Sequence, residues 1–395
     1  MFRHLFKMIW NRKKQNFLLI TEMFVSFMVV FAVFTLLVHN FRNYRQPAGF
    51  EYENVWSINA NNVRNYTNND SLMRFHQVLR NQLLSMPEIQ TVSWTGNNIP
   101  FAMSTRNGTL THNKMDIRKV NYYTTDDGYK DVLNFQMVEG RWFSREDNGS
   151  RDHPVVITAG LKQKLFGDQP AAGQLLGDPS GEGHRRRVVG VIQDVKDKGD
   201  YNEAVDGVYE RADTAAYSWL NTILIKVAPG AGGDFEGRLF KTVASAMKDS
   251  NVEIEHLSDK RVARNNFSLV PIIVLLIVAG FLIGNVALGL FGVLWYNISK
   301  RKAEIGLRRA IGASSQAVSG QLVGEAMVIS TLALIVGSFF AIQFPLLKLF
   351  DLAPSVYLIA WLLAMIFIYA LVVICAFYPG RQAAAIHPAV ALHEE

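Results

Sequence analysis

The sequence SKRKAEIGLRRAIGAS, residues 299–314, is a short basic stretch between two long apolar runs. It contains too many charges to enter the hydrocarbon core of a bilayer, where each ionised side chain costs about 3 kcal/mol or more. It is also too short to fold as a domain of its own. The stretch therefore predicts a membrane protein in which this segment is an exposed loop between two spans.

Four apolar windows are long enough to cross the roughly 30 Å hydrocarbon core as helices. They cover residues 17–38, 268–296, 322–344 and 356–378. The first is about twice as long as the apolar core of a signal peptide and is followed by no small-residue cleavage site, so we expect it to be an anchor. An even number of spans places both termini on the same side of the membrane.

Lysine and arginine residues near the spans predict the orientation, because they are retained on the cytoplasmic side. The residues before the first span include five basic side chains and no acid, and the loop at 297–321 has five basic residues against one acid. Both segments are therefore predicted to be cytoplasmic, which places residues 39–267 in the periplasm. That segment has 28 basic and 28 acidic residues, so the net charge of +6 reflects topology. Nucleic-acid binding is a poor explanation of it.

The remaining segments follow from this topology. Residues 1–16 have apolar side chains at helical spacing with basic ones largely opposite, which predicts an amphipathic helix on the inner leaflet. A disordered basic tail is the alternative. Residues 345–355 would form a short periplasmic loop, and residues 379–395 a cytoplasmic tail.

The segment at 39–267 mixes strand-like and helix-like patterns, which predicts an α+β domain. Strands are expected at 53–59, 91–94, 154–158, 187–192 and 222–227. Helices are expected at 72–85, 161–166 and 235–248. The fold class is therefore four transmembrane helices with a large α+β periplasmic domain between the first two.

Three details of this domain can be predicted from single residues. Asn107-Gly108 is typical of a hairpin turn, and Asp234 is expected to cap the following helix. The only cysteine of the chain, Cys375, lies in the fourth span. The periplasmic domain therefore has no disulfide and depends on its apolar core for stability.

Motifs for catalysis were sought and not found. The sequence has no Walker A motif, no H-E-x-x-H and no Cys/His cluster. The stretch Gly230–Gly237 is glycine-rich, but its spacing differs from G-x-G-x-x-G, and a turn before a helix explains it better. Ser245 and Lys248 have Ser-x-x-Lys spacing without the other motifs of that enzyme class. We expect no catalytic, cofactor-binding or metal-binding residue on this chain.

The spans contain two acids and a pair of glycines of interest. Glu22 and Glu325 lie in the first and third spans near their cytoplasmic ends, where they can reach water or a basic partner. The sequence leaves their role open. Gly280 and Gly284 of the second span are four residues apart, a spacing that lets helices pack closely. Their partner could be a helix of the same chain or of a second protomer.

The basic loop resembles the signature of the MacB/FtsX-type ABC transporter permeases, in RKAEIGLRRAIGAS at 301–314 followed by Gln321 and Glu325. The tail YPGRQAAAIHPAVAL at 378–392 is similar to that of the family, although Gly380 stands where alanine is usual. Further stretches resemble the periplasmic core domain of the family, namely 135–143, 154–158, 165–167 and 188–195. One span, a large external domain and three more spans is also the order of the family. The first span lacks the glycine-rich pattern of many members.

The resemblance implies a permease subunit that transmits force and is not itself an enzyme. A separate cytoplasmic ABC ATPase would bind ATP and Mg, and its motion would pass through the spans to the periplasmic domains of two protomers. The second protomer could form a homodimer or a heterodimer, and a periplasmic adaptor is a candidate partner. The expected location is the bacterial inner membrane, with both termini cytoplasmic.

The loop residues expected to dock the ATPase are Glu304, Ile305, Gly306, Leu307, Arg308, Arg309, Gly312 and Ala313. Ile305 and Leu307 would provide apolar contacts, and the two arginines would donate hydrogen bonds. The two glycines would permit close approach or a turn. The charges at Lys300–Lys302 are expected to fix topology only.

Export of an antimicrobial compound or peptide is the function that the resemblance favours. Within the family, FtsX-like control of cell-wall hydrolases and release of lipoproteins are alternatives. A transmembrane sensor of a periplasmic ligand is an alternative of another class. A sensor requires an output domain, and residues 379–395 are a short segment for that role.

Overall fold

The computed structural model describes residues 13–61, 69–103, 105–177, 185–214, 216–247, 250–300 and 302–384. Most of the predicted amphipathic helix at 1–16 and of the predicted tail at 379–395 lies outside these residues. The chain divides into two compact units. The external unit comprises residues 43–268, and the membrane unit comprises residues 1–42 and 269–395.

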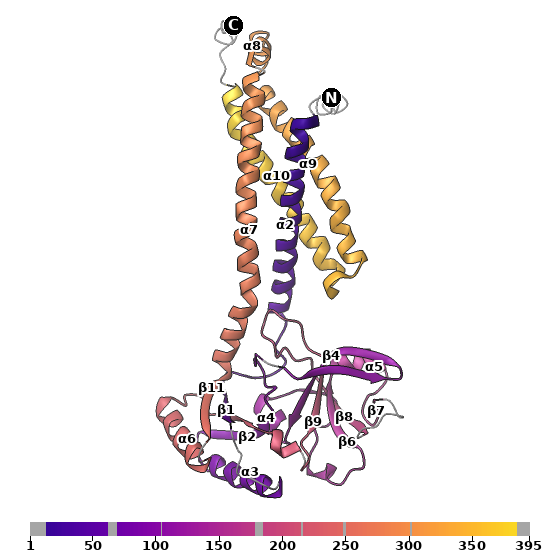
Figure 1. The fold of residues 1–395 in the computed structure, drawn as a ribbon, viewed down its shortest axis with the longest axis vertical. Helices are drawn as coiled ribbons and strands as arrows, with labels where there is room; N and C mark the ends of the chain where they lie inside the picture. The colour runs from indigo at the N-terminus through magenta and orange to yellow at the C-terminus, as the bar shows by residue number, and fades with distance from the viewer. Residues whose placement is uncertain are drawn as a thin grey trace. The chain divides into compact units, whose positions relative to one another are not determined.

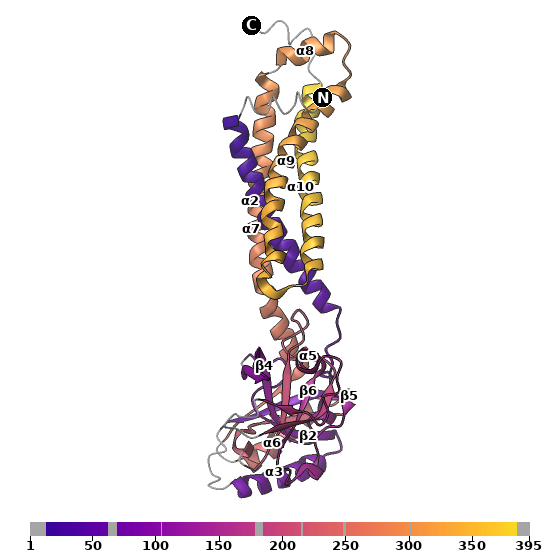
Figure 2. The same ribbon diagram turned by 90° about the vertical axis from the view of Figure 1, so that its right-hand side faces the viewer.

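The membrane unit contains four helices that are long and apolar enough to cross a bilayer. They are α2 (Lys13–Tyr44), α7 (Leu257–Lys300), α9 (Ser315–Leu346) and α10 (Pro354–Ala384). The short helix α8 (Lys302–Ala310) joins α7 to α9, and a 3-10 turn, η3 (Leu349–Asp351), joins α9 to α10. Both views show the four long helices side by side, with α8 at the end where α2 begins and α10 ends (Figure 1, Figure 2).

Large side chains of α2 pack against small ones of α9 and α10. Phe27 of α2 is fully buried, as are Ala333 of α9 and Ala360 and Ala364 of α10. Small residues let helix backbones approach closely, and in lipid this close packing replaces the hydrophobic driving force. A Cβ atom added at Gly337 of α9 would lie 2.9 Å from a ring carbon of Phe27. Helix α2 lacks the glycine-rich pattern of many family members, and the small residues that allow close packing here lie on α9 and α10 instead.

The external unit is built on one mixed sheet of 11 strands in the order β11-β1-β10-β2-β4-β9-β6-β8-β5, with β3 paired to β4 and β7 to β8. The strands are β1 (Val55–Asn61), β2 (Ile89–Thr95), β3 (Asn107–His112), β4 (Met115–Thr125), β5 (Met137–Gly140), β6 (His153–Thr158), β7 (Leu175–Leu176), β8 (Arg186–Ile192), β9 (Gly207–Arg211), β10 (Thr222–Val227) and β11 (Asn251–His256). This architecture confirms the predicted fold class.

The sheet has two halves that meet at a single residue pair. Strands β2 and β4 are paired only through Thr95 and Thr125. We call β11-β1-β10-β2 with its helices the first lobe, and β4-β9-β6-β8-β5 the second lobe. A sheet joined by one pair has little ladder bonding to fix the angle between its halves.

Each lobe has its own apolar core. In the first lobe, α3 (Asn69–Leu84) and α6 (Gly233–Ala246) cover one face of the sheet, where Leu83 and Leu239 are fully buried. In the second lobe, α5 (Ala159–Phe166) packs on β6 and β8. A third cluster, rich in aromatic rings, contains α4 (Tyr129–Leu133) and joins the two lobes.

Two local predictions for this domain are wrong. The turn between β3 and β4 is at Asn113-Lys114, where both residues have positive φ as a type I′ turn requires. The predicted turn residues, Asn107 and Gly108, are instead paired with β4. The N-cap of α6 is Gly232, without a side-chain hydrogen bond, and Asp234 lies in the first turn. Its carboxylate still suits the positive end of the helix dipole there.

Candidate functional site

The loop between α7 and α9 folds as a helix with a defined end. Helix α8 stops in a turn in which the amide of Ala313 donates to the carbonyl of Arg308 at 3.0 Å. Gly312 has φ +102°, a backbone conformation that a side chain would strain. The side chain of Ser314 then accepts from the amide of Ala317 at 3.2 Å and caps α9. The chain therefore turns sharply between two helices whose ends are both fixed.

The apolar residues of α8 face in two directions. Ile305 is 6% exposed and packs with residues of the flanking helices, namely Ile298, Val318 and Leu322. Leu307 is 54% exposed and Ile311, four residues later, is 78% exposed. Ile305 thus holds α8 against α7 and α9, whereas Leu307 and Ile311 present an apolar surface. Ile311 is absent from the predicted docking residues, although its i,i+4 spacing from Leu307 is visible in the sequence.

Polar side chains tie α8 to α9 in a chain of hydrogen bonds. Arg308 donates to Glu304 and to Gln321, each at 2.6 Å. Gln321 in turn donates to Glu325 at 3.2 Å. Arg308 and Glu304 are both nearly half exposed, so their pair stabilises the helix by only about 0.3–0.5 kcal/mol. The consequence is mainly geometric, because these bonds fix the position of α8 relative to α9. Gly306 is buried, and Arg309 also belongs to α8.

The predicted packing glycines of α7 face open space in this chain. No described atom lies within 4 Å of a Cβ added at Gly280 or Gly284. Ile277 and Phe281 beside them are 68% and 71% exposed. Gly289 is different, because a Cβ there would lie 2.7 Å from the Glu22 carboxylate. Gly289 therefore makes room for Glu22 within the chain, and the face at Gly280 and Gly284 is available to a second protomer or to lipid.

Leucine substitutions should separate these two kinds of glycine. Gly337→Leu should destabilise the purified protein by about 1–3 kcal/mol, because it overpacks the buried Phe27 ring. Gly280→Leu with Gly284→Leu should leave stability unchanged and lower the dimer fraction. Thermal unfolding and light scattering after size exclusion, both in detergent, measure the two quantities. An unchanged dimer fraction would assign the Gly280 and Gly284 face to lipid.

In the external unit, a buried lysine ties together segments that are distant in sequence. Lys196 is 3% exposed, and its Nζ donates to three carbonyls, those of Asn43 at 2.5 Å, Asp200 at 2.7 Å and Gln46 at 3.3 Å. Burial lowers the pKa of Lys196. Asn43 is near the end of α2, so Lys196 fastens that end to the loop at 196–202, which we call the latch loop.

The latch loop is also bonded to the first turns of α7. Arg261 forms an ion pair with the Asp200 carboxylate at 2.6 Å. Asn265 donates to the same carboxylate at 2.7 Å and accepts from the Asp200 amide at 2.9 Å. The rings of Tyr44 and Tyr201 stack at 5.7 Å. One loop of the external domain thus holds both helices that continue into the membrane unit, an arrangement that no local sequence pattern indicated.

Among the described residues, no group of three or more His, Cys, Asp or Glu side chains could hold a metal ion. The candidate functional features are a helix between spans, a face of α7 without a partner among the described residues, and the latch loop.

Two family models match the chain. One, described as the MacB-like periplasmic core domain, matches residues 17–234, which is more than half of the chain. The other, described as the FtsX-like permease C-terminal, matches residues 269–388. The second match contains α8 and the helices that flank it.

Curated relatives match at low identity. A Bdellovibrio bacteriovorus protein named macrolide export ATP-binding/permease protein MacB is 24% identical over 273 residues, which are 65% of this chain and 41% of that protein. The protein of the same name from Escherichia coli O6:K15:H31 is 24% identical over 362 residues, 86% of this chain and 53% of that protein. The chain thus spans about half the length of the curated relatives it matches.

The solved structures that match this chain have lower sequence identity to it than the curated relatives have. The periplasmic region of MacB from Actinobacillus actinomycetemcomitans has 16% identity and a TM-score of 0.39, covering 57% of this chain and 98% of that one. The extracellular domain of the noncanonic ABC-type transporter YknZ from Gram-positive bacteria has 15% identity and a TM-score of 0.34, covering 51% of this chain and 100% of that one.

Proposed function

Because this chain belongs to the MacB/FtsX-type ABC transporter permeases, we propose that it transmits ATP-driven motion from a cytoplasmic ATPase to its external domain. An ABC permease works with an ATPase partner, and the four apolar helices make this chain an inner-membrane protein. In the proposed orientation α8 and both termini are cytoplasmic, and the external domain is periplasmic. The partner ATPase binds ATP and Mg, and this chain binds no cofactor.

The observation that best supports this proposal is the placement of α8. Buried Ile305 and the bonds of Arg308 fix α8 to α7 and α9, and Leu307 and Ile311 remain exposed. A partner that engages the exposed pair would displace two spans together. Helix α7 is a single helix of 44 residues that starts directly after β11 and ends just before α8. Such a helix can carry a displacement along its length without a hinge loop.

A second permease protomer is part of the proposal, because the face at Gly280 and Gly284 has no partner among the described residues of this chain. A periplasmic adaptor is a candidate third component. For the task, we propose export of an antimicrobial compound or peptide, because the curated relatives are named as macrolide export proteins. Control of cell-wall hydrolases, release of lipoproteins and sensing of a periplasmic ligand are the alternatives.

The proposal can be tested by measuring whether ATP moves the external domains. A single label is introduced with Arg118→Cys, on the exposed surface of β4, in a Cys375→Ser background. The labelled permease is reconstituted in nanodiscs with a candidate ATPase. Electron–electron double resonance measures the distance between the labels of the two protomers. This distance should shift when ATP is added to a complex whose ATPase variant binds ATP but does not hydrolyse it. Hydrolysis by the active complex with no such shift would contradict the proposal.

A further inference from the structure

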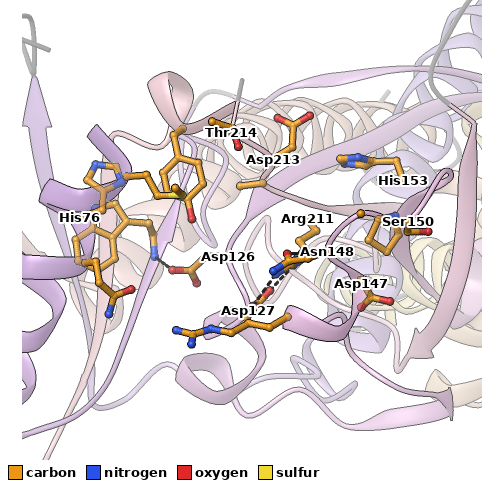
Figure 3. Close-up of a pocket in the computed structure, with 18 of the residues that line it drawn as sticks. His76, Asp126, Asp127, Asp147, Asn148, Ser150, His153, Arg211, Asp213 and Thr214 are labelled. Atoms are coloured by element: carbon orange, nitrogen blue, oxygen red, sulfur yellow. Dashed lines mark hydrogen bonds and ion pairs between the residues drawn. The ribbon is translucent and has the colours of Figure 1, made fainter. Parts of the chain in front are cut away.

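A pocket of about 920 Å³ opens in the external domain between the two lobes, beside the single pair that joins β2 to β4. Its residues come from α3 and β2 in the first lobe and from β6, the end of β9 and the loop after β5 in the second. Figure 3 shows His76 on one wall and His153 and Ser150 on the opposite one, with Asp127 and Arg211 between them. A molecule bound here would contact both lobes.

The wall from the first lobe is aromatic. The His76 ring stacks on Trp94 with centroids 5.1 Å apart, and Tyr217 lies 5.7 Å from His76. Arg80 lies over the other part of this wall, 5.3 Å from the Trp94 ring centroid. The Trp94 and His76 rings are themselves buried, so the apolar surface that this wall offers a ligand is that of the half-buried Tyr217 ring and of the exposed Met73.

Two buried nitrogens of this wall have no hydrogen-bond partner among the described residues. They are Nδ1 of His76 and Nε1 of Trp94, and the two residues are 4% and 2% exposed. Burial lowers the pKa of His76 to about 4, so the ring is neutral at physiological pH. Unpaired buried polar atoms are costly, and a polar ligand atom or an ordered water would satisfy them.

Three of the four carboxylates of the pocket are already paired with fixed partners. Asp126 pairs with Arg80 and also accepts from Ser93 at 2.7 Å and from the Trp94 amide at 2.9 Å. The remaining two are held by arginine: Asp127 accepts two bonds from Arg211, at 2.6 and 3.0 Å, and Asp147 accepts two from Arg141, at 2.6 and 2.8 Å. These acids therefore offer little attraction to a cationic ligand.

Three arginines that line the pocket are not used in this way. Arg74 on α3, and Arg145 and Arg151 in the segment between β5 and β6, are exposed, and none of them forms an ion pair with a described carboxylate. Arg74 belongs to the first lobe and the other two to the second. Asp213, the last acid of the lining, is exposed and accepts the amide of Ala216 at 2.8 Å. The uncommitted charge of the pocket is therefore mainly positive, and guanidinium groups bind carboxylates and phosphates in a bidentate manner.

We propose that this pocket binds a small organic anion, whose carboxylate or phosphate group pairs with the uncommitted arginines, Arg74, Arg145 and Arg151, and whose aromatic or apolar body lies against Tyr217 and Met73. The bound molecule contacts both lobes and adds to the contacts of the aromatic cluster that already joins them, so it stabilises one angle between them. This binding does not require an ATPase or a transport cycle.

Three ligands with the same ring system test the proposal. They are 1-naphthoate, 1-naphthyl phosphate and 1-naphthylmethylammonium, titrated calorimetrically into the full-length chain in nanodiscs without ATPase. At least one of the two anions should bind, the cation should bind at least about tenfold more weakly, and added salt should weaken binding. Preference for the naphthoate or for the naphthyl phosphate then identifies which acid group the pocket prefers.

A matched pair of variants assigns the binding to this pocket. Arg74→Ala with Arg145→Ala should weaken anion binding about tenfold or more. Both side chains are exposed, so the unfolding temperature should not change. Arg118→Ala, at an exposed site on β4, should leave binding as it was. Equal affinity for the anions and the cation, no binding of either anion, or equal losses in the two variants would overturn the proposal.

Discussion

Replacement of Leu307 and Ile311 together by aspartate is expected to abolish association of the permease with its ATPase. The two side chains are 54% and 78% exposed on α8 and are the apolar part of its free surface. Burying each one against a partner contributes roughly 2 kcal/mol, and a carboxylate in the same place adds an uncompensated desolvation cost. The dissociation constant should therefore rise at least about 1,000-fold. Co-purification of the two subunits and stimulation of ATPase activity measure the loss.

Two further variants show whether the effect belongs to docking. Lys300→Glu reverses a charge just outside α8. Its expected effect on association is small, because the charges at Lys300–Lys302 are expected to fix the topology and not to contact the ATPase. Arg308→Glu should give an intermediate loss, because it breaks the bonds to Glu304 and Gln321 and leaves the apolar pair in place. If Lys300→Glu were as damaging as the double aspartate variant, positive charge and not a docking surface would explain the loop. Accessibility of an engineered cysteine from each side of the membrane checks that the topology is unchanged.

The sequence predicted the parts of this protein that depend on local pattern. Four apolar windows indicated the four long helices, because crossing hydrocarbon requires about 20 apolar residues in a row. Gly312 was expected to permit a turn, and it ends α8 with positive φ. Strands β1, β2, β6, β8 and β10 and helices α3, α5 and α6 of the external domain were visible as alternation and helical periodicity, whereas β5, β9 and β11 were not predicted.

The direction in which each side chain points was less predictable. Ile305 and Leu307 are both apolar and only two residues apart, so they lie on different faces of a helix. The sequence alone does not say which face meets the flanking helices. In the structure Ile305 is buried between them and Leu307 is exposed. The hairpin shows the same limit, because both Asn107-Gly108 and Asn113-Lys114 suit a turn, and the pairing of β3 with β4 selects the second.

The pocket and the latch loop could not be predicted, because their residues are distant in sequence. Arg74 and Arg145 belong to opposite lobes, and they line one pocket only because the two lobes meet. Lys196 would appear in a sequence as an ordinary surface lysine after a strand. Its burial depends on three carbonyls, two from the segment at the end of α2 and one from its own loop, and no pattern of side chains encodes carbonyl positions.

The latch loop is where motion of the helices would reach the external domain. Lys196 binds the end of α2, and Asp200 four residues later binds the first turns of α7 through Arg261 and Asn265. Helices that are fastened to the same loop should displace that loop together. If Lys196 no longer holds α2, only the Tyr44–Tyr201 stack and the bond from the Asn43 side chain to the Tyr201 carbonyl still attach α2 to the loop. Part of the displacement should then be lost before it reaches the sheet.

Lys196→Met is therefore expected to destabilise the external domain and to uncouple it from the ATPase. Methionine fills a similar volume but leaves three carbonyls without their donor, and an unmet buried acceptor costs about 1–3 kcal/mol. A total loss of about 3 kcal/mol in the free energy of unfolding should lower the unfolding temperature of a domain of this size by roughly 6–12 °C.

Lys164→Met is the matched control, because Lys164 is 57% exposed and its pair with Asp206 contributes about 0–1 kcal/mol. Co-purification of the ATPase should persist in both variants, since α8 is untouched. The ATP-dependent shift between spin labels should shrink only in Lys196→Met, measured below its lowered unfolding temperature. A full shift there, with the domain folded, would show that the bonds of Lys196 are not needed to carry the displacement.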